Sequence, residues 1–352
     1  MKKVLIALFC GIFFVSCAFF SLGMMIPGAS HAAEGAGDMP AFIGEDGIND
    51  DFGDEFETWF SKSFAFRSNV VDAFSDFREK VFATGNDQVI VGKDGFLFFA
   101  DTVDAFTGID PMTDDEIGSA ADSLEALSEY AAAQGSRFVF APAPDKNTVY
   151  PDMMPDRYKK GEAPSDMDRL FAELEVRGID FVDLRPVLRS AADDELIYHK
   201  LDTHWNAIGA LYAFNEIMNF VGKDVPDFGE RIEDHSFVGD LAALLYPGRT
   251  VYDDDITFDF SDKFIYTSAY SNPMDLIIST RGAGDGRLLI FRDSFGSALI
   301  PYAAGTYSEV KFERANPYRI DLLSTFKADL VIVEVAERNL RDLIGSDGRI
   351  GK

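Results

Sequence analysis

Short apolar segments alternate with amphipathic segments along most of the chain, and this alternation predicts the fold. Apolar runs predict buried strands at 137–141, 179–183, 288–291, 309–312 and 330–333. Apolar positions at helical spacing predict helices at 113–133, 165–176, 207–221, 296–304 and 319–326. Buried strands separated by helices are typical of a mostly parallel sheet that is covered by helices on both faces. The pattern therefore predicts an α/β domain.

Two regions before the main alternation and one region within it depart from this pattern. Aromatic residues recur at helical spacing in 55–85, which predicts an N-terminal helical segment whose apolar stripe packs in a core. The apolar runs 89–91 and 96–99 flank a glycine turn, so we expect a hairpin that opens the main domain. The stretch 222–281 is rich in Asp, Gly and Pro with short strand-like pieces such as 264–266, and we expect an irregular insertion that forms one wall of a substrate cleft.

The amino terminus resembles an export signal. A basic start, an apolar run to about Pro27 and a small-residue exit near Ala32 are typical of a secretory leader. The apolar run exceeds the roughly 7–15 residues of a usual signal core. Residues 1–32 are therefore interpreted either as a cleaved signal peptide or as a membrane anchor, and residues 33–54 as a linker. Both alternatives predict a location outside the cytoplasm, in the periplasm or at the cell surface.

Charge and cysteine content narrow the possible chemistry. The chain carries a formal net charge of −28, which disfavours nucleic acids and anionic lipid surfaces as partners and counts mildly against a highly anionic polysaccharide. Both cysteines, Cys10 and Cys17, lie in the leader, so no disulfide or thiolate chemistry is expected in a processed protein.

Two polar segments are predicted to follow strands or precede helices at one edge of the sheet, where parallel sheets gather reactive groups. Ser294 follows an apolar strand and opens a helix, and Asp202 and His204 stand just before another helix. A serine nucleophile needs a base within hydrogen-bond reach, and that base needs a third group to orient it. Although each segment alone is also an ordinary helix cap or turn, their joint placement predicts Ser294 as nucleophile, His204 as base and Asp202 as the orienting carboxylate.

The other histidines are weaker candidates. His31 lies at the leader exit, and His235 lies in the irregular insertion. His199 can be a residue that supports the site or a zinc ligand together with His204. No compact metal-ligand motif surrounds the pair, so we expect no metal site.

Six segments of the sequence occur in an order that is specific to one family. These segments are 64–67 (FAFR), 91–97 (VGKDGFL), 144–151 (PDKNTVYP), 201–210 (LDTHWNAIGA), 292–296 (RDSFG) and 335–340 (VAERNL). Together they resemble the alginate O-acetylation proteins AlgJ and AlgX, an Asp-x-His-Trp branch of the SGNH-hydrolase-like superfamily. The resemblance implies a three-layer, flavodoxin-like domain over 86–345.

The same resemblance implies the roles of particular residues. It carries over a Ser294, His204 and Asp202 triad, with the carboxylate and imidazole preceding the serine, as in a circularly permuted SGNH domain. In unpermuted SGNH enzymes an Asn at the end of the third strand helps bind the oxyanion, and 336–339 resembles that position. The residues expected as oxyanion or substrate contacts, besides the Ser294 amide, are Arg338, Asn339, Arg292, Trp205 and Lys146.

The predicted function is acetyl transfer to hydroxyls of an exopolysaccharide or cell-wall polysaccharide through an acetyl-serine. The family implies that a membrane-bound O-acyltransferase supplies the acetyl group, with a polysaccharide as acceptor and no cofactor or metal. Two alternatives stay open. The first is a secreted carbohydrate acetyl esterase with the same triad, and the second is a non-catalytic carbohydrate-binding component of a polymer-export complex.

Overall fold

The computed structural model describes residues 39–44, 47–49, 51–63, 71–72, 76 and 85–346. The chain divides into a small unit, Met1–Phe82 with Tyr246–Thr250, and a large unit that holds the rest. The predicted leader, 1–32, lies outside the described residues. Within those ranges, no helix has both the length and the apolar character needed to cross a membrane.

The described part of the small unit includes a short hairpin and a helix. Strands β1 (Ile43–Gly44) and β2 (Gly47–Ile48) pair antiparallel, and α2 (Phe52–Ser63) follows them. The range predicted as a linker, 33–54, thus contains a hairpin and the first turn of a helix. Most of the remaining helical segment predicted at 55–85 lies outside the described residues.

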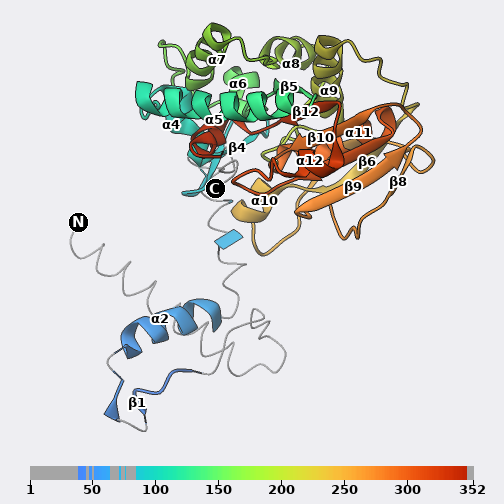
Figure 1. The fold of residues 1–352 in the computed structure, drawn as a ribbon. Coiled ribbons are helices and arrows are strands. Elements are labelled where there is room, and N and C mark those ends of the chain that lie inside the picture. The colour runs from blue at the N-terminus through green and yellow to red at the C-terminus, as the bar shows by residue number, and fades with distance from the viewer. Residues whose placement is uncertain are drawn as a thin grey trace. The chain divides into compact units, whose positions relative to one another are not determined.

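The large unit is organised around a six-stranded sheet with the order β5-β12-β10-β11-β9-β8. Neighbours are parallel from β5 to β11, and β9 and β8 add antiparallel at the other edge. The sheet is therefore mostly parallel, as predicted (Figure 1). The strands are β5 (Arg137–Phe140), β8 (Phe264–Tyr266), β9 (Ile277–Gly282), β10 (Arg287–Phe291), β11 (Glu309–Glu313) and β12 (Leu330–Val333).

Alternate residues of the central strands enter two separate hydrophobic cores, because successive side chains of a strand point to opposite faces. In β10, Leu288 and Ile290 belong to one core, whereas Leu289 and Phe291 belong to the other. Both faces of the sheet are thus buried, which explains why these strands are apolar throughout. The sheet and the helices that cover its two faces form the predicted three layers.

Each core is closed by its own set of helices. The first contains side chains from α6 (Lys146–Val149), α8 (Arg185–Ala192), α9 (Ala207–Val221), the 3-10 helix Phe295–Leu299 and α11 (Ile300–Thr306). The second contains side chains from α5 (Asp114–Ala133), α7 (Asp166–Arg177), α12 (Leu322–Phe326) and the 3-10 helix Glu337–Leu343.

Local caps explain where the long helices begin. Thr113 and Ser165 open α5 and α7 with reciprocal capping boxes. The Asn206 side chain accepts a hydrogen bond from the Gly209 amide, so α9 begins directly after the Asp-Thr-His-Trp segment. The cap therefore fixes the point at which the polar loop meets the helix.

The insertion predicted at 222–281 is more ordered than its composition indicates. Strands β6 (Arg231–Val238) and β7 (Tyr252–Phe258) form an antiparallel hairpin with a register shift between Asp234 and Phe237. The chain between these strands includes α10 (Asp240–Leu245). Beyond the hairpin, β8 and β9 extend the main sheet; β8 is the strand-like piece predicted at 264–266, whereas the other strands of this region were not predicted.

Other predicted elements need smaller corrections. The strand expected at 179–183 is a single bridge between Phe181 and Phe140. The helix expected at 296–304 is a 3-10 helix followed by α11, and the helix expected at 319–326 is shortened to α12. The predicted hairpin is confirmed as β3 (Val89–Val91) and β4 (Leu97–Phe99), which form a separate two-stranded sheet.

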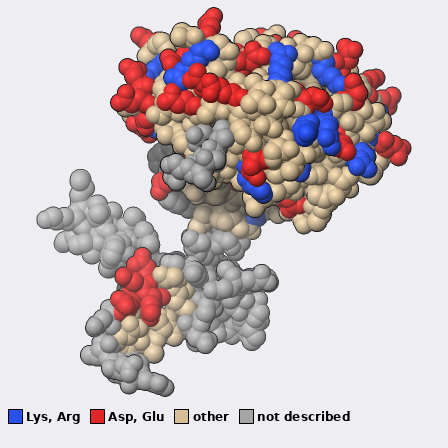
Figure 2. Space-filling view, viewed as in Figure 1, with Lys and Arg blue, Asp and Glu red and all other residues tan. Residues whose placement is uncertain are grey.

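The remaining short helices of the large unit lie in its connections. They are the 3-10 helix Ala100–Thr102, α4 (Val103–Thr107) and the 3-10 helix Pro151–Met153. Figure 2 shows acidic side chains over much of the visible face of the large unit, with Lys and Arg distributed among them. This mixture is consistent with the strong net negative charge of the chain.

Candidate active site

The serine and the histidine of the predicted triad come from two segments that meet at the carboxyl end of the parallel strands. Ser294 lies three residues beyond β10 and directly before the 3-10 helix Phe295–Leu299. His204 lies in the loop between α8 and α9, which an isolated bridge between Tyr198 and Trp205 closes. The two segments are 90 residues apart in the sequence, yet their side chains are in contact.

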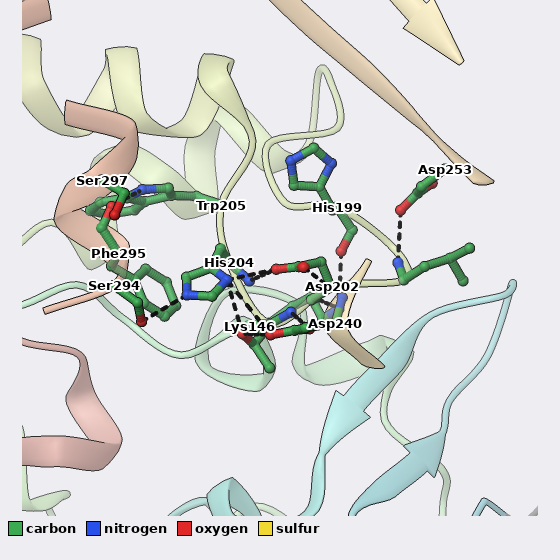
Figure 3. Close-up of polar contacts among 12 residues, drawn as sticks. Lys146, His199, Asp202, His204, Trp205, Asp240, Asp253, Ser294, Phe295 and Ser297 are labelled. Carbon is green, nitrogen blue, oxygen red and sulfur yellow. Dashed lines mark hydrogen bonds and ion pairs between the residues drawn. The ribbon is translucent and has the colours of Figure 1, made fainter. Parts of the chain in front are cut away.

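The three side chains form a continuous hydrogen-bonded chain (Figure 3). The Nε2 atom of His204 lies 2.9 Å from the Ser294 Oγ. Its Nδ1 atom lies 2.6 Å from the Asp202 Oδ1. With a proton on Nδ1 that Asp202 accepts, Nε2 is left free to accept the serine proton, which is the arrangement that activates a serine.

Asp202 is buried and firmly held as a carboxylate. Its Oδ1 also accepts from the His204 amide at 2.8 Å, and its Oδ2 accepts from the Asp240 amide at 2.8 Å. Burial opposes ionisation, but the hydrogen bond and charge of His204 and these two amides outweigh it. The pKa of Asp202 therefore lies well below its usual range.

A second carboxylate, which the sequence analysis did not select, lies beside the imidazole. Asp240 accepts from the Thr203 amide at 2.8 Å and from the Thr203 hydroxyl at 2.7 Å, and its Oδ2 is 3.8 Å from the His204 Nδ1. Burial and repulsion from Asp202 raise the pKa of Asp240. No motif surrounds Asp240 in the sequence, so only the fold reveals this contact.

Asp202, His204 and Asp240 are also the group of side chains, within the described part of the chain, whose atoms are close enough to ligate a cation. Their donor atoms lie within 4.8 Å of one another. A cation there would compete for the Nδ1 and carboxylate atoms that already hydrogen-bond to one another and to Thr203. The arrangement fits a proton-transfer chain better than a metal site.

A buried lysine, Lys146, holds the loop that carries Asp202 and His204 by hydrogen bonds to its backbone. The Lys146 ammonium donates to the carbonyls of His199, Lys200 and Asp202 at 3.0, 3.0 and 2.6 Å. Burial lowers the pKa of Lys146 to about 7, while Asp202 and Asp240 favour its charged form. Three carbonyl acceptors match the three donors of an ammonium, and this fit supports the charged state.

The same loop is braced by the insertion. The Leu201 amide donates to the Asp253 Oδ2 of β7 at 2.7 Å, and the Leu201 carbonyl accepts from the Ala242 amide of α10 at 3.0 Å. Gly239 approaches this carbonyl so closely that a Cβ atom there would lie 2.1 Å from it. The hairpin β6–β7 and α10 therefore hold this loop in addition to Lys146.

The residue before the serine joins two strand ends. The Asp293 Oδ1 accepts from the Phe295 amide at 2.9 Å, and its Oδ2 accepts from the Ala336 amide at 2.8 Å and from the Asn339 Nδ2 at 2.9 Å. The turn after β10 is thereby tied to the segment after β12. The Trp205 indole donates to the Phe295 carbonyl at 3.0 Å, which ties the serine segment to the histidine loop.

Buried charged groups pack against the turn that carries Ser294, residues 292–297. Arg292, 2% exposed, donates to the Ser297 Oγ at 2.9 Å and to the carbonyls of Pro273 and Asp275. Burial lowers its pKa to about 10 and raises the pKa of the nearby Glu334 well above its usual range. A Cβ atom on Gly296 would lie 2.6 Å from both the Arg292 Cβ and the Glu334 Oε2, so this turn requires glycine.

Arg338 packs against the ring of the residue that follows Ser294. Its NH1 group donates to the buried Asp145 Oδ1 at 2.8 Å, and its guanidinium stands 5.1 Å from the centre of the Phe295 ring. The Asp145 amide in turn donates to the Glu337 Oε2 at 3.0 Å. Arg338 therefore connects the ends of β5 and β12 to the ring that follows Ser294.

A cleft of about 560 Å³ opens beside the triad. Besides Ser294, His204 and Asp202, its lining includes Trp205 and many apolar and aromatic side chains from 255–274. The expectation that the insertion forms one wall of this cleft is confirmed by that lining. Of the residues predicted as oxyanion or substrate contacts, Trp205 lines the cleft, whereas Arg338, Asn339, Arg292 and Lys146 lie around it and bind protein groups.

The fold and the site define an SGNH hydrolase-like domain. Residues 89–250 match the family described as "SGNH hydrolase-like domain, acetyltransferase AlgX". The match covers a little less than half of the chain, and over these residues the chain is similar to that family.

Two curated relatives and one solved structure are similar to this chain. The chain is 26% identical to the "Probable alginate O-acetylase AlgJ" of Pseudomonas syringae pv. tomato over 197 residues, which is 54% of this chain and 49% of that protein. It is 27% identical to the protein of the same name from Pseudomonas aeruginosa over 236 residues, 62% of this chain and 54% of that protein. The chain thus spans about half the length of these relatives.

The solved structure is a DHHW family protein from Eubacterium siraeum. It superposes with a TM-score of 0.57 at 17% identity and covers 76% of this chain and 96% of its own. At this level of identity the likeness concerns the fold, and it extends over most of the large unit.

Proposed function

We propose that this protein is an extracytoplasmic O-acetyltransferase that transfers acetyl groups to polysaccharide hydroxyls through an acetyl-serine. The observation that carries the proposal is the continuous chain from the Ser294 Oγ through the His204 imidazole to the Asp202 carboxylate. The relatives named as probable alginate O-acetylases and the matched acetyltransferase domain support the same reaction.

In the first half-reaction, the Ser294 Oγ attacks the acetyl carbonyl of the donor while the His204 Nε2 accepts the hydroxyl proton. The carbonyl oxygen becomes an oxyanion. The Ser294 amide makes no hydrogen bond to another residue within the described ranges, so it is our candidate donor to this oxyanion. Collapse of the intermediate expels the donor's leaving group, which takes the proton from Nε2 and leaves an acetyl-serine.

In the second half-reaction, a sugar hydroxyl enters the cleft beside the acetyl-serine. His204 accepts the proton of that hydroxyl as its oxygen attacks the acetyl carbon. The bond to the Ser294 Oγ then breaks, and the proton returns from Nε2 to that oxygen. The products are an O-acetyl sugar and the free serine, so no cofactor is consumed.

The surrounding residues act as positioning residues in this mechanism. Lys146 holds the carbonyls of the His204 loop, and Asn339 holds Asp293 before the serine. Arg292 supports the turn that carries Ser294 by donating a hydrogen bond to the Ser297 Oγ. Arg338 can stabilise the same turn through the Phe295 ring and Asp145. Trp205 is placed both to join the two segments and to contact substrate.

The acetyl donor and the location are part of the same proposal. We infer that a membrane-bound O-acyltransferase supplies the acetyl group, since acetyl-CoA is confined to the cytoplasm. The leader predicted at 1–32 accounts for export, either as a cleaved signal peptide or as an attachment to the membrane.

Mass spectrometry of protein incubated with an activated acetyl ester tests the proposal. We expect one acetyl adduct on the wild type and none on Ser294→Ala. The matched control is Ser297→Ala, because Ser297 also lines the cleft but does not contact His204. Ser297→Ala removes a contact of Arg292 but keeps the nucleophile, so it should still form the adduct. An adduct that persists in Ser294→Ala, or no adduct on the wild type, would contradict the proposal.

The fate of the adduct distinguishes transfer from hydrolysis. After the ester is removed, the acetyl-enzyme is mixed with an oligosaccharide, and both acetate and O-acetyl sugar are measured. Transfer to sugar supports the acetyltransferase. Release of acetate alone, at a rate that added sugar does not change, would indicate a carbohydrate acetyl esterase instead.

A further inference from the structure

The wall of the cleft facing Ser294 is apolar and aromatic. It comes mainly from β7, β8 and the segment that connects β8 to β9, all within the insertion. The aromatic and aliphatic members of this wall are Ile256, Phe260, Phe264, Tyr266, Tyr270 and Met274. A wall of this kind recognises its ligand by shape and by apolar contact more than by charge.

The charged groups of the lining have one sign. The residues that line the cleft, all of them described, include the acids Asp202 and Asp255 and the histidines His199 and His204, but no Lys or Arg. Burial lowers the pKa of His199, so its imidazole adds no positive charge near neutral pH. The lining therefore offers no fixed cation to an anionic ligand.

Four arginines that interact with residues of this lining already bind protein groups. Arg231 pairs with Glu195, and Arg338 pairs with Asp145. Arg292 is buried and donates to carbonyls and to Ser297. Arg314 donates to the Met274 carbonyl at 3.3 Å. Recruiting one of these cations to a ligand would break a contact that supports the site.

Two tyrosines provide a flat surface in the wall. The rings of Tyr266 and Tyr270 stack with their centres 3.8 Å apart and their planes 12° apart, and each residue is 37% exposed. Stacked tyrosines offer rigid apolar faces with hydroxyls at the edge. The C–H face of a sugar ring and its hydroxyl groups match such a surface.

We propose that the acceptor is a glycan whose sugar units in this cleft carry no carboxylate or phosphate, and that the Tyr266 and Tyr270 pair holds it. This inference rests on the proposed function, because it assigns the cleft beside Ser294 to the acceptor. The proposed acceptor differs from the polymer named in the relatives, because alginate consists of uronic acids, which are negatively charged.

Charge repulsion predicts that the cleft favours neutral acceptors over anionic ones. A uronate in the cleft would lie close to Asp202 and Asp255 in surroundings that are partly shielded from water, where repulsion between like charges is stronger than in bulk solvent. The net charge of −28 adds a long-range repulsion that salt screens. We expect a neutral acceptor to be favoured by about tenfold or more in kcat/KM.

The test compares two oligosaccharides that differ only in charge. The acetyl-enzyme is mixed with oligomers of β-1,4-linked mannuronate or with the same oligomers after reduction of their carboxyls to neutral mannose units. Mass spectrometry then measures O-acetyl product. We expect the neutral oligomer to be acetylated at least about tenfold faster, with a smaller difference at high salt. Equal rates, a faster rate with mannuronate, or acetylation of neither oligomer would overturn the inference.

A charge introduced into the wall tests the same idea in the opposite direction. Thr257 lines the cleft and is exposed on β7, so a longer side chain fits there without repacking. We expect Thr257→Lys to increase transfer to mannuronate relative to the neutral oligomer by about tenfold, whereas the uncharged Thr257→Gln leaves the ratio unchanged. An unchanged ratio in Thr257→Lys would contradict the electrostatic argument.

The tyrosine pair is tested by Tyr270→Ala with Tyr270→Phe as control. The alanine variant should lower kcat/KM for the neutral oligomer about tenfold, a larger loss than in the rate of acetyl-serine formation. The phenylalanine variant keeps the ring and should lose less. If both variants transfer as fast as the wild type, the pair does not hold the acceptor. An adduct on Ser294 without charge selectivity would refute this inference alone, whereas absence of the adduct would refute the proposed function.

Discussion

Asn339 donates its side-chain hydrogen bond to the Asp293 Oδ2 atom, 2.9 Å away, and not into the cleft beside Ser294. The same oxygen accepts from the Ala336 amide. The segment after β12 thus sets the position of the residue that precedes the nucleophile. Asn339 is therefore expected to affect catalysis indirectly, by setting the geometry of the turn that carries Ser294.

Replacement of the orienting carboxylate is expected to reduce turnover sharply. An amide at position 202 can donate to the His204 Nδ1 and so favour the tautomer that cannot accept the serine proton at Nε2. We expect Asp202→Asn to lower kcat for acetyl-serine formation by about 10³- to 10⁴-fold. Asp240→Asn is the control, because its Oδ2 lies 3.8 Å from Nδ1 and should cost roughly tenfold. Stopped-flow assays with an activated ester would measure both, and equal losses would contradict the assignment.

The buried pair of Arg338 and Asp145 is expected to couple strongly. Arg338→Met leaves the Asp145 carboxylate buried without its partner, and this should lower the free energy of unfolding by about 3 kcal/mol. Asp145→Asn in the same chain removes the uncompensated charge and should restore part of the loss. Urea denaturation of the two single variants and the double variant gives the coupling energy. Strictly additive losses would show that the pair is not coupled.

Glu337 is expected to make stability depend on pH. Burial, together with the neighbouring Asp145 carboxylate, raises the pKa of Glu337 to about 7. In the unfolded chain this pKa returns to about 4.5, so between the two values the folded state binds more protons. Its stabilising contribution is complete below pH 4.5 and is lost as the pH rises through about 7.

Glu337→Gln removes this titration. Between pH 5 and pH 8 the free energy of unfolding of the variant should fall by roughly 2–3 kcal/mol less than that of the wild type. Denaturant titrations at both pH values measure the difference. A steeper fall in the variant than in the wild type would reverse the predicted sign.

Gly296 is expected to tolerate no side chain. A Cβ atom would lie 2.6 Å from the Arg292 Cβ and the Glu334 Oε2, so Gly296→Ala should displace the serine turn and cost about 2–3 kcal/mol. Gly118→Ala is the control, because nothing lies within 4 Å of its Cβ position in α5, and it should be neutral or slightly stabilising. Thermal unfolding and adduct formation would compare the two. A Gly296→Ala protein with unchanged stability would contradict the prediction.

The central part of the fold follows directly from local sequence patterns. β10, β12 and the two capped helices α5 and α7 are apolar or amphipathic over their whole length, and their positions were predicted closely. Within the insertion, the piece that forms β8 was predicted, but β6, β7 and β9 were missed, and β9 joins the sheet by pairing with the distant β11 and with β8. Pairing between distant segments leaves little trace in local composition.

The site shows the same division between local and distant information. Ser294, His204 and Asp202 stand in recognisable local motifs, and the fold brings them together. Asp240 and Asp253 could not be found in this way, because each contacts the loop at 199–206 from a segment about 40 or 50 residues further along the chain. The predicted contacts of Arg338 and Asn339 depended on an analogy of position, which does not specify which neighbour each side chain binds.

The hairpin β6–β7 both anchors the histidine loop and lines the cleft, so transplanting the hairpin would change both. Its Asp253 anchors the backbone next to Asp202, while the residues that follow it line the cleft. Exchange of the whole insertion for that of a relative would therefore remove an anchor of the proton-transfer chain along with the old specificity. Redesign of acceptor choice in this protein has to proceed one cleft-facing side chain at a time, with Asp253 and Asp240 kept in place.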